Sequence, residues 1–392
     1  MYLEQFILKE TDAHLSLVKH VISAHAQGRN LVISPLSIHV LLGLTVSGSR
    51  GPTRAQLLRY LNSDSSEQIN SLFSQIFGTV LCDGSPLGGP VLSTQNGLWV
   101  DQSLNLKPDF RDIAANSYKA VAEHVDFKNR AEEARQQVNA WADNETNGLI
   151  KEIVPPKSVN HMTRLILANA VYFKGAWTEE FDASLTSDRD FYLINGSPVR
   201  TPFMTCWEKQ RVRAFDGFKV LQLPYKRGEY RLSFSMYIYL PDARDGLPAL
   251  IEKICSEPGF INRHLPNKVE MLAAFWVPKF KVSFGFEASE VLKGLGVVNL
   301  FEMGDLTEMV EDSDLGEKLC VSKIWHKAFI EVNEQGTEAA AVTAEEIEEM
   351  GCGLWEYPQL EFVADHPFVF VLREDTTGVV LFVGQLLDPL AQ

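Results

Sequence analysis

Helical and strand-like periodicities are separated along this chain. Apolar residues recur at helical spacing after a candidate capping pair, Thr11 and Asp12, and residues 132–141 are rich in strong helix formers. Beyond about residue 160 strand patterns dominate, and residues 232–240 alternate between apolar side chains and Ser or Tyr, as in a half-buried strand. Because helices precede strands instead of alternating with them, the sequence predicts an α+β fold with antiparallel or mixed sheets.

Further strands are expected within one domain. Five segments have strand-like composition: residues 165–173, 277–284, 328–332, 368–372 and 379–386. We find no repeat and no long linker, and the Gly- and Pro-rich residues 83–90 are only long enough for a surface loop. We therefore expect a single domain over residues 1–392, although the length alone would suggest two or three.

Charge and cysteine content restrict the partners and the compartment. The formal net charge of -15 repels phosphate backbones and anionic lipid, so neither nucleic acid nor a membrane is an expected partner. No apolar run reaches the roughly 18 residues of a membrane span, and acidic residues interrupt the N-terminal segment where a secretory signal would be apolar. Five dispersed cysteines favour a reducing compartment. The expected location is the cytoplasm, with unconventional export left open.

The usual motifs of enzymes, metal sites and cofactor sites are absent from the sequence. There is no His-Glu-x-x-His, no Cys-x-x-Cys, no Gly-x-Ser-x-Gly and no Gly-x-Gly-x-x-Gly after a strand. We therefore expect no enzyme, no cofactor and no metal ion. A hydrolase with a Ser/His/Asp arrangement assembled from distant positions stays open as an alternative.

The segment after residue 335 is unusual for a globular core. Residues 336–344 are mostly small, and glutamates that require water follow, namely Glu345, Glu346, Glu348 and Glu349. Composition alone fits an alanine-rich surface helix. Strand patterns on both sides instead favour a stretch of roughly 25 residues without its own core, and such stretches are usually functional.

This segment and the rest of the chain resemble the serpins, and plant serpins in particular. Residues 334–341 read Glu-Gln-Gly-Thr-Glu-Ala-Ala-Ala, which is similar to the hinge of that family. Residues 362–368, Phe-Val-Ala-Asp-His-Pro-Phe, resemble the plant members. Other matching segments are residues 30–37, 139–141 with 146–150, 167–177, 234–241, 277–280 and 378–389. The matches are ordered and cover the whole chain.

The resemblance implies a serpin fold and a suicide inhibitor. The fold would be a single domain with three β-sheets, about nine helices and an exposed reactive-centre loop over about residues 336–361. A serine protease would attack the loop and form an acyl-enzyme, and insertion of the cleaved loop into the central sheet would trap it. Fourteen inserted residues make a strand of about 46 Å. Papain-like cysteine proteases are a secondary target class, and the inhibitor is expected to be a monomer.

The resemblance also assigns the hinge and the bait. The hinge residues are Glu334, Gly336, Thr337, Glu338, Ala339, Ala340 and Ala341. Counting seventeen residues from Glu334 places the reactive bond at Met350–Gly351. An unbranched thioether suits the apolar pockets of chymotrypsin-, elastase- or subtilisin-like proteases, and a trypsin-like target is not expected. Cys352 beside this bond is either a redox-sensitive thiol or an incidental cysteine.

Two polar sites are carried over from the family. The shutter, where buried polar groups exchange hydrogen bonds as strands part, matches Ser34, Ser37, Asn169 and His326. The site where the loop first inserts matches Trp177, Lys279 and Glu334. Lys279 and Glu334 are expected to pair there and to hold the uncleaved state.

Glu345 departs from the family pattern. In an inserted strand Thr337, Ala339 and Ala341 would face the core, and the same register turns Glu345 inward. Relatives commonly have an apolar or small residue there, and burying an unpaired carboxylate costs several kcal/mol. We therefore expect leaky inhibition. The alternative is a non-inhibitory serpin that acts as a binding or scaffold protein.

Overall fold

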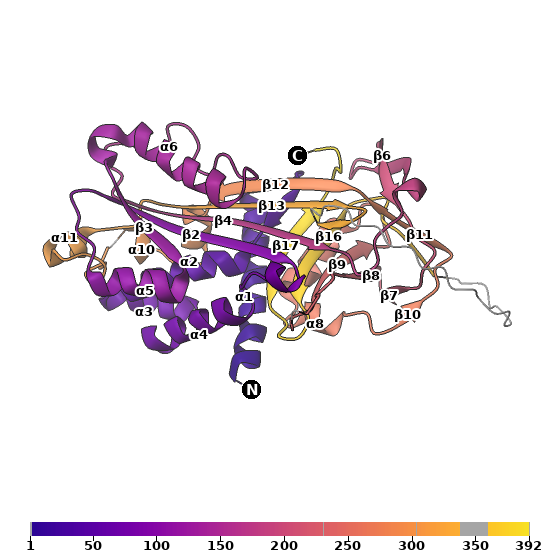
Figure 1. Ribbon diagram of the computed structural model, residues 1–392, viewed down its shortest axis with the longest axis horizontal. Helices are drawn as coiled ribbons and strands as arrows, with labels where there is room; N and C mark the ends of the chain where they lie inside the picture. Colours follow the sequence, from indigo (N-terminus) through magenta and orange to yellow (C-terminus); the bar gives the residue numbers. More distant parts are fainter. Residues whose placement is uncertain (1, 230, 303, 338–359, 392) are drawn as a thin grey trace.

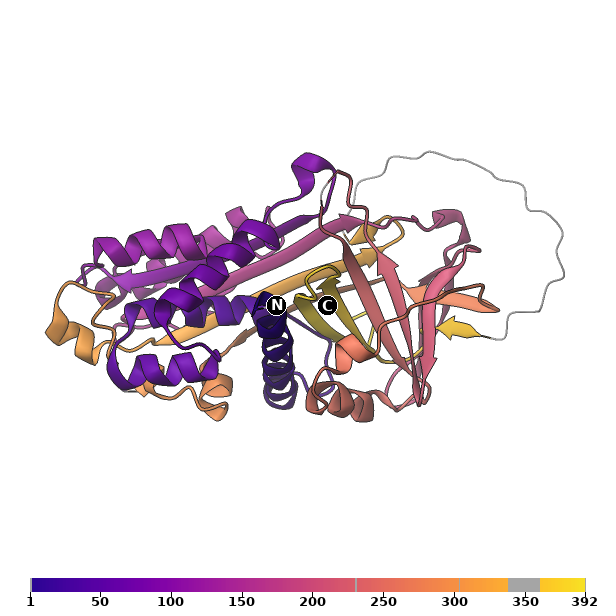
Figure 2. The same ribbon diagram turned by 90° about the horizontal axis from the view of Figure 1, so that it is seen from below.

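Three β-sheets organise the residues described by this computed structural model, which are 2–229, 231–302, 304–337 and 360–391 (Figure 1). Most helices of the first 150 residues lie at one end of the elongated molecule, and the strand-rich part lies at the other (Figure 2). The α+β prediction is confirmed. None of the helices in the described ranges is long and apolar enough to cross a membrane.

Eleven α-helices are present in the described part of the chain, where about nine were expected, and four of them have six residues or fewer. They are α1 (Tyr2–His25), α2 (Pro35–Gly48), α3 (Gly51–Tyr60), α4 (Ser66–Thr79), α5 (Pro108–Tyr118), α6 (Phe127–Glu145), α7 (Leu247–Ser256), α8 (Phe260–Arg263), α9 (Ser289–Gly294), α10 (Asn299–Glu302) and α11 (Ser313–Lys318). Two short 3-10 helices cover Ser85–Leu87 and Ala183–Leu185.

The six-stranded sheet is buried on both faces along its strand Leu165–Ala176. Its order is β12 (Phe280–Glu287), β13 (Lys323–Asn333), β14 (Gly336–Thr337), β4 (Leu165–Ala176), β2 (Val91–Asp101) and β3 (Ala120–Val125). Along β4, Leu165, Leu167 and Val171 face the main core. The alternate residues Ile166 and Ala168 pack into a second core together with Ala134 and Val138 of α6. Helix α6 lies over this face of the sheet (Figure 1). This double covering explains the nearly continuous apolar run.

A seven-stranded sheet and a four-stranded sheet form the other part. The first has the order β1 (Leu31–Ile33), β17 (Val380–Leu386), β16 (Phe368–Glu374), β9 (Phe234–Pro241), β8 (Phe218–Pro224), β7 (Gln210–Phe215) and β10 (Val269–Glu270). The second has the order β15 (Glu361–Val363), β11 (Ala274–Pro278), β6 (Pro198–Met204) and β5 (Ser187–Tyr192).

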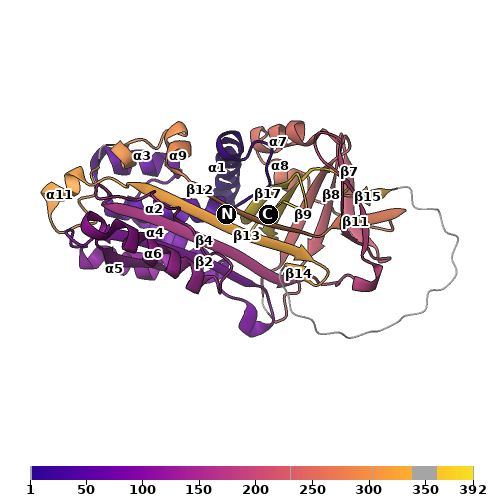
Figure 3. The same ribbon diagram turned by 90° about the horizontal axis from the view of Figure 1, so that it is seen from above.

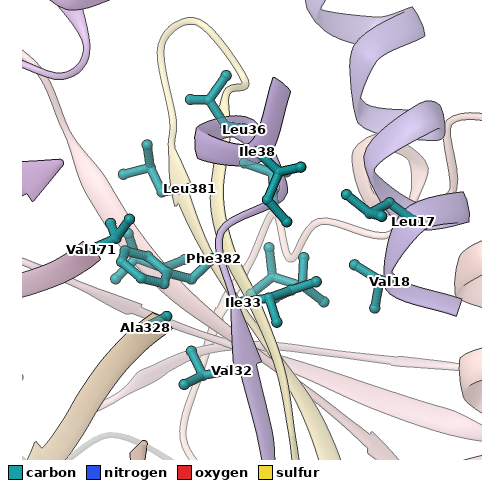
Figure 4. Close-up of a cluster of buried hydrophobic side chains, with 14 of the residues drawn as sticks. Leu17, Val18, Val32, Ile33, Leu36, Ile38, Val171, Ala328, Leu381 and Phe382 are labelled. Carbon is teal, nitrogen blue, oxygen red and sulfur yellow. The ribbon is translucent and has the colours of Figure 1, made fainter. Parts of the chain in front are cut away.

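Segments far apart in the sequence share the main core. Figure 4 shows side chains from α1, β1, α2, β4, β13 and β17 meeting in one cluster. The labelled members are Leu17, Val18, Val32, Ile33, Leu36, Ile38, Val171, Ala328, Leu381 and Phe382. Both larger sheets therefore pack on the same apolar centre, which is consistent with one domain.

Three local predictions were wrong. Helix α1 begins at Tyr2, so Thr11 and Asp12 lie inside it, and the Asp12 carboxylate instead accepts the N–H of Gly259 at 2.8 Å. Residues 277–284 are not one strand, because β11 ends at Pro278 and β12 begins at Phe280 in another sheet. Strand β9 is buried along its whole length instead of half-buried, because both faces are covered.

Candidate functional site

Strands β13 and β4 meet along a line that we call the seam. Seven residue pairs lie side by side in parallel orientation, from Lys323–Ile166 to Phe329–Tyr172. Beyond Phe329 the two strands diverge, and β14 occupies the gap as an antiparallel neighbour of both (Figure 3). The chain that leaves β13 therefore turns back at once into the sheet.

Gly336 makes this reversal possible. Its φ of 150° favours glycine, and a Cβ atom here would collide with the carbonyl oxygen of Gly175. The side chain of Asn333 supports the turn, because its Oδ1 accepts the N–H groups of Gln335 and Gly336 at 3.1 and 3.2 Å. Thr337 follows, fully buried, with its hydroxyl 2.7 Å from the Tyr225 hydroxyl. The hinge residues Gly336 and Thr337 are thus already part of the sheet.

Trp177 lies directly beside the turn. Its indole N–H donates to the carbonyl of Asn333 at 2.9 Å, and its backbone N–H donates to the carbonyl of Gln335 at the same distance. The indole stacks on the Tyr225 ring, with centroids 4.4 Å apart. Because Tyr225 also contacts Thr337, one aromatic pair supports both the turn and the first inserted residue.

Lys279 and Glu334 form an ion pair next to Trp177. The lysine Nζ lies 2.8 Å from Oε2 of Glu334, and the Thr186 hydroxyl donates to Oε1 at 2.8 Å. Burial by itself raises the pKa of the Glu334 carboxyl. Hydrogen bonds from Lys279, the backbone and Thr186 lower this pKa by more than burial raises it, so the net pKa is below its usual value. The Lys279 side chain is about one-third exposed, and screening by solvent limits how much the ion pair stabilises the fold.

A chain of hydrogen bonds crosses the seam at the pair His326–Asn169, in the middle of the paired stretch. The N–H of Ser34 donates to Nε2 of His326 at 3.2 Å, which assigns the ring proton to Nδ1. Nδ1 lies 3.1 Å from Oδ1 of Asn169 and donates to it. Asn169 donates in turn to Oδ1 of Asn96 at 2.6 Å, and Asn96 donates to the carbonyl of Tyr118 at 3.0 Å.

The predicted shutter residues contribute unequally to this chain. Ser34 takes part through its backbone, while the Ser37 hydroxyl donates to the Ser34 carbonyl at 2.9 Å and does not reach His326. Burial lowers the pKa of His326 to about 3, so the ring is neutral at physiological pH. Sequence reasoning missed Asn96, which stands opposite Asn169 in the register of β2 and β4.

Several predicted site residues lie outside the described ranges. They are Glu338, Ala339, Ala340, Ala341, Met350, Gly351, Cys352 and the glutamates at 345, 346, 348 and 349. The described chain resumes at Leu360, whose carbonyl accepts the N–H of Ala273 at 2.9 Å, and β15 then pairs in parallel with β11. The segment therefore connects the six-stranded sheet to the four-stranded sheet.

Known proteins are similar to this chain over nearly its whole length. A family model described as "Serpin (serine protease inhibitor)" matches residues 9–389. Serpin-ZX of Arabidopsis thaliana is 50% identical over 391 residues, which is 100% of both chains. Serpin-ZXA of Oryza sativa subsp. japonica is 50% identical over 369 residues, covering 94% of this chain and 92% of the relative. The solved structure of Arabidopsis AtSerpin1 in its native stressed conformation matches with a TM-score of 0.91 and 49% identity, over 100% of this chain and 99% of that one.

Proposed function

The chain belongs to the serpin family, and on this premise we propose that it inhibits serine proteases as a suicide substrate cut at Met350–Gly351. The observation that carries the proposal is the position of Gly336 and Thr337, which already stand as a strand at the open end of the seam. Cleavage would free the following residues to continue that strand.

The register of β14 fixes where each residue of an inserted loop would stand. Thr337 is paired with Gly175 on one side and Val332 on the other. Because β14 is antiparallel to both neighbours, each further residue moves one position down β4 and one down β13. In a loop inserted in this register, Thr343 would stand between Asn169 and His326, which are direct partners in the uncleaved protein.

Side-chain size along this path supports insertion. Ala339 would stand between Phe173 and Ile330, and Ala341 would stand between Val171 and Ala328, all of them buried on the main-core face. Small residues enter such a packed interior without overpacking it. The Thr343 hydroxyl can both donate and accept, so it can replace the bond between His326 and Asn169.

The residue at the bait position defines the target class. The methionine side chain of Met350 fits the apolar pockets of chymotrypsin-, elastase- or subtilisin-like enzymes, and papain-like cysteine proteases are a secondary class. The protein would act as a cytoplasmic monomer, itself no enzyme and without a cofactor. Its net charge of -15 supports a protein partner in preference to nucleic acid or membrane.

Covalent trapping is the direct test. The protein is mixed with chymotrypsin, elastase, subtilisin and papain, and the products are separated on denaturing gels. We expect a band somewhat below the sum of the protease mass and 44.0 kDa, because the C-terminal peptide that begins at Gly351 is released on the denaturing gel. The control is Thr343→Arg, whose side chain does not fit between Asn169 and His326, so it should be cut without trapping. Clean turnover of the unmodified protein by every protease would exclude the mechanism.

The non-inhibitory alternative rests on a different position. If the loop inserted in the same register, Glu345 would stand between Leu167 and Ile324, both fully buried. Burying a carboxylate there costs free energy and so opposes insertion of the loop. A serpin that acts as a binding or scaffold protein would not insert its loop. The two functions differ in thermal stability after the loop is nicked: an inserting chain gains stability because a strand is added to the sheet, whereas a non-inserting chain melts at nearly the same temperature.

A further inference from the structure

A buried group of ionisable side chains lies between α1 and α2, away from the loop. Glu10 and His14 are one turn apart on α1, and His39 lies near the start of α2. Their exposed fractions are 4%, 3% and 0%. One ligand atom from each lies within 4.8 Å of the other two.

Most polar atoms in this group have no hydrogen bond. Oε2 of Glu10 is hydrogen-bonded to Nδ1 of His39 at 2.6 Å, and Nε2 of His14 lies 3.5 Å from the same oxygen, which is too long for a good hydrogen bond. Oε1 of Glu10, both ring nitrogens of His14, Nε2 of His39 and the nearby Tyr60 hydroxyl are all buried without a hydrogen bond. The great majority of buried side-chain polar atoms in folded proteins have a partner. Five such atoms in one place therefore indicate that a binding species completes this group.

We propose that Glu10, His14 and His39 bind a divalent transition-metal ion, of which zinc fits best. Two imidazoles and one carboxylate are a donor set that suits zinc, whereas magnesium and calcium prefer oxygen alone. Nε2 of His14 lies 3.5 Å from Oε2 of Glu10. That separation is close to the about 3.4 Å between neighbouring ligands of a tetrahedral zinc ion with bonds of 2.0–2.1 Å. A water molecule would complete the tetrahedron.

His39 joins the site by giving up its present hydrogen bond. The Nδ1 proton of His39 lies between Nδ1 and Oε2 of Glu10, which would both bind the ion, so Nδ1 must lose this proton and the ring carries its proton on Nε2 when the ion is bound. The two atoms then separate by roughly 0.8 Å to reach tetrahedral spacing. The ion joins α1 to α2, and the residue that precedes α2 is Ser34, the donor to His326. Metal binding should therefore stabilise the N-terminal part of the fold against heat.

Cobalt provides a spectroscopic test on the full chain. After treatment with a chelator, the protein is titrated with Co²⁺, whose tetrahedral complexes absorb strongly in the visible range. The variants are Glu10→Gln and His14→Leu, and the matched control is His20→Leu, because His20 is exposed on the same helix. We expect one tetrahedral Co²⁺ per chain for the unmodified protein and the control, and at least a tenfold loss of affinity in both ligand variants.

Zinc-dependent melting gives an independent reading. Zinc should raise the melting temperature of the unmodified protein and of His20→Leu, and should leave Glu10→Gln and His14→Leu unchanged. The nitrogens of His14 make no hydrogen bond, and the only polar contact that His14→Leu removes is the 3.5 Å contact with Glu10, so this variant should fold without metal. Glu10→Gln keeps an acceptor for His39 and carries the test if His14→Leu fails to fold. The proposal is overturned if the unmodified protein gives no tetrahedral spectrum, or if both ligand variants retain it.

Discussion

The imidazole of His326 and the side-chain amide of Asn169 face each other across the seam, joined by a hydrogen bond of 3.1 Å between Nδ1 and Oδ1. The two residues are also paired in the backbone register of β13 and β4. This side-chain bond must break if β13 and β4 separate. The stability of the closed sheet and the ease of loop insertion therefore depend on the same pair.

Removing the imidazole should loosen the seam. His326→Ala leaves the N–H of Ser34 and Oδ1 of Asn169 without partners, at a cost of roughly 1–3 kcal/mol. Because the strands then part more easily, we expect loop–sheet polymers on mild heating, measured by native gels and light scattering. The control is His20→Ala, because His20 is exposed on the surface of α1. A His326→Ala protein that stays monomeric and melts at the unmodified temperature would contradict this role.

His326 should also make stability depend on pH. Burial lowers its pKa in the folded state from 6.5 to about 3, so below pH 6.5 the unfolded chain binds a proton that the folded chain excludes. Stability contributed by the neutral ring is complete above pH 6.5 and is lost as the pH falls towards 3. The loss has a limiting slope of about 1.4 kcal/mol per pH unit.

A comparison with His326→Gln isolates this contribution. Glutamine can hydrogen-bond but does not titrate, so the variant should be less stable than the unmodified protein at pH 7.5. The difference should shrink at pH 5, where only the unmodified protein has lost stability at this position. Midpoints of urea unfolding at the two pH values measure this, and an equal difference at both would show that His326 does not titrate as stated.

Gly336 should be required for the reversal into the sheet. In Gly336→Ala the new Cβ meets the carbonyl of Gly175, and the φ of 150° is strained for any other residue. We expect β14 to leave the gap, with faster amide exchange at Gly336 and Thr337 and several-fold more inhibitor consumed per enzyme inactivated. Gly294→Ala is the control, because a Cβ atom added there would meet nothing within 4 Å. Unchanged exchange in Gly336→Ala would disprove the requirement.

The sequence predicted what depends on local pattern and missed what depends on register. The reversal at Gly336 is expected from the resemblance to the family hinge, and the small residues between strand patterns only mark the segment as unusual. Asn96 was missed, since only the pairing of β2 with β4 brings it opposite Asn169. Glu10 and His14 have the spacing of one helical turn, but His39 joins them only through the packing of α1 on α2. No spacing rule anticipates such contacts between separate elements.

The break at Lys279 has a similar explanation. Residues 277–284 alternate as one strand would, but Pro278 cannot donate to a ladder, and the backbone N–H of Lys279 bonds to the carbonyl of Pro202 instead. The chain passes from one sheet to another at this point, and this places the Lys279 side chain beside Glu334. The proline is a local signal for the break, whereas the pairing of Lys279 with Glu334 is expected from the family resemblance and from no local pattern.

Glu345 should limit the efficiency of inhibition. In an inserted strand it would lie between Leu167 and Ile324, where a carboxylate is either buried unpaired, at several kcal/mol, or protonated. Insertion should begin readily at the alanines and slow at this residue, which gives the protease time to deacylate. We therefore expect more than one inhibitor molecule to be consumed per enzyme inactivated, with improvement at mildly acidic pH because protonation removes the buried charge.

The neighbouring glutamate supplies a matched control for this effect. Glu345→Val should lower the number of inhibitor molecules consumed per enzyme towards one, because valine suits a site between Leu167 and Ile324. Glu346 would point to the opposite face, between Ile166 and Lys323. The Lys323 side chain is 40% exposed and pairs with Glu287 at 3.3 Å, so the Glu346 carboxylate would there be near a lysine and water. Glu346→Val should therefore bring no such gain. Titration of active protease against each variant gives the number directly; a value near one in the unmodified protein, or equal changes in both variants, would show that Glu345 does not face the core.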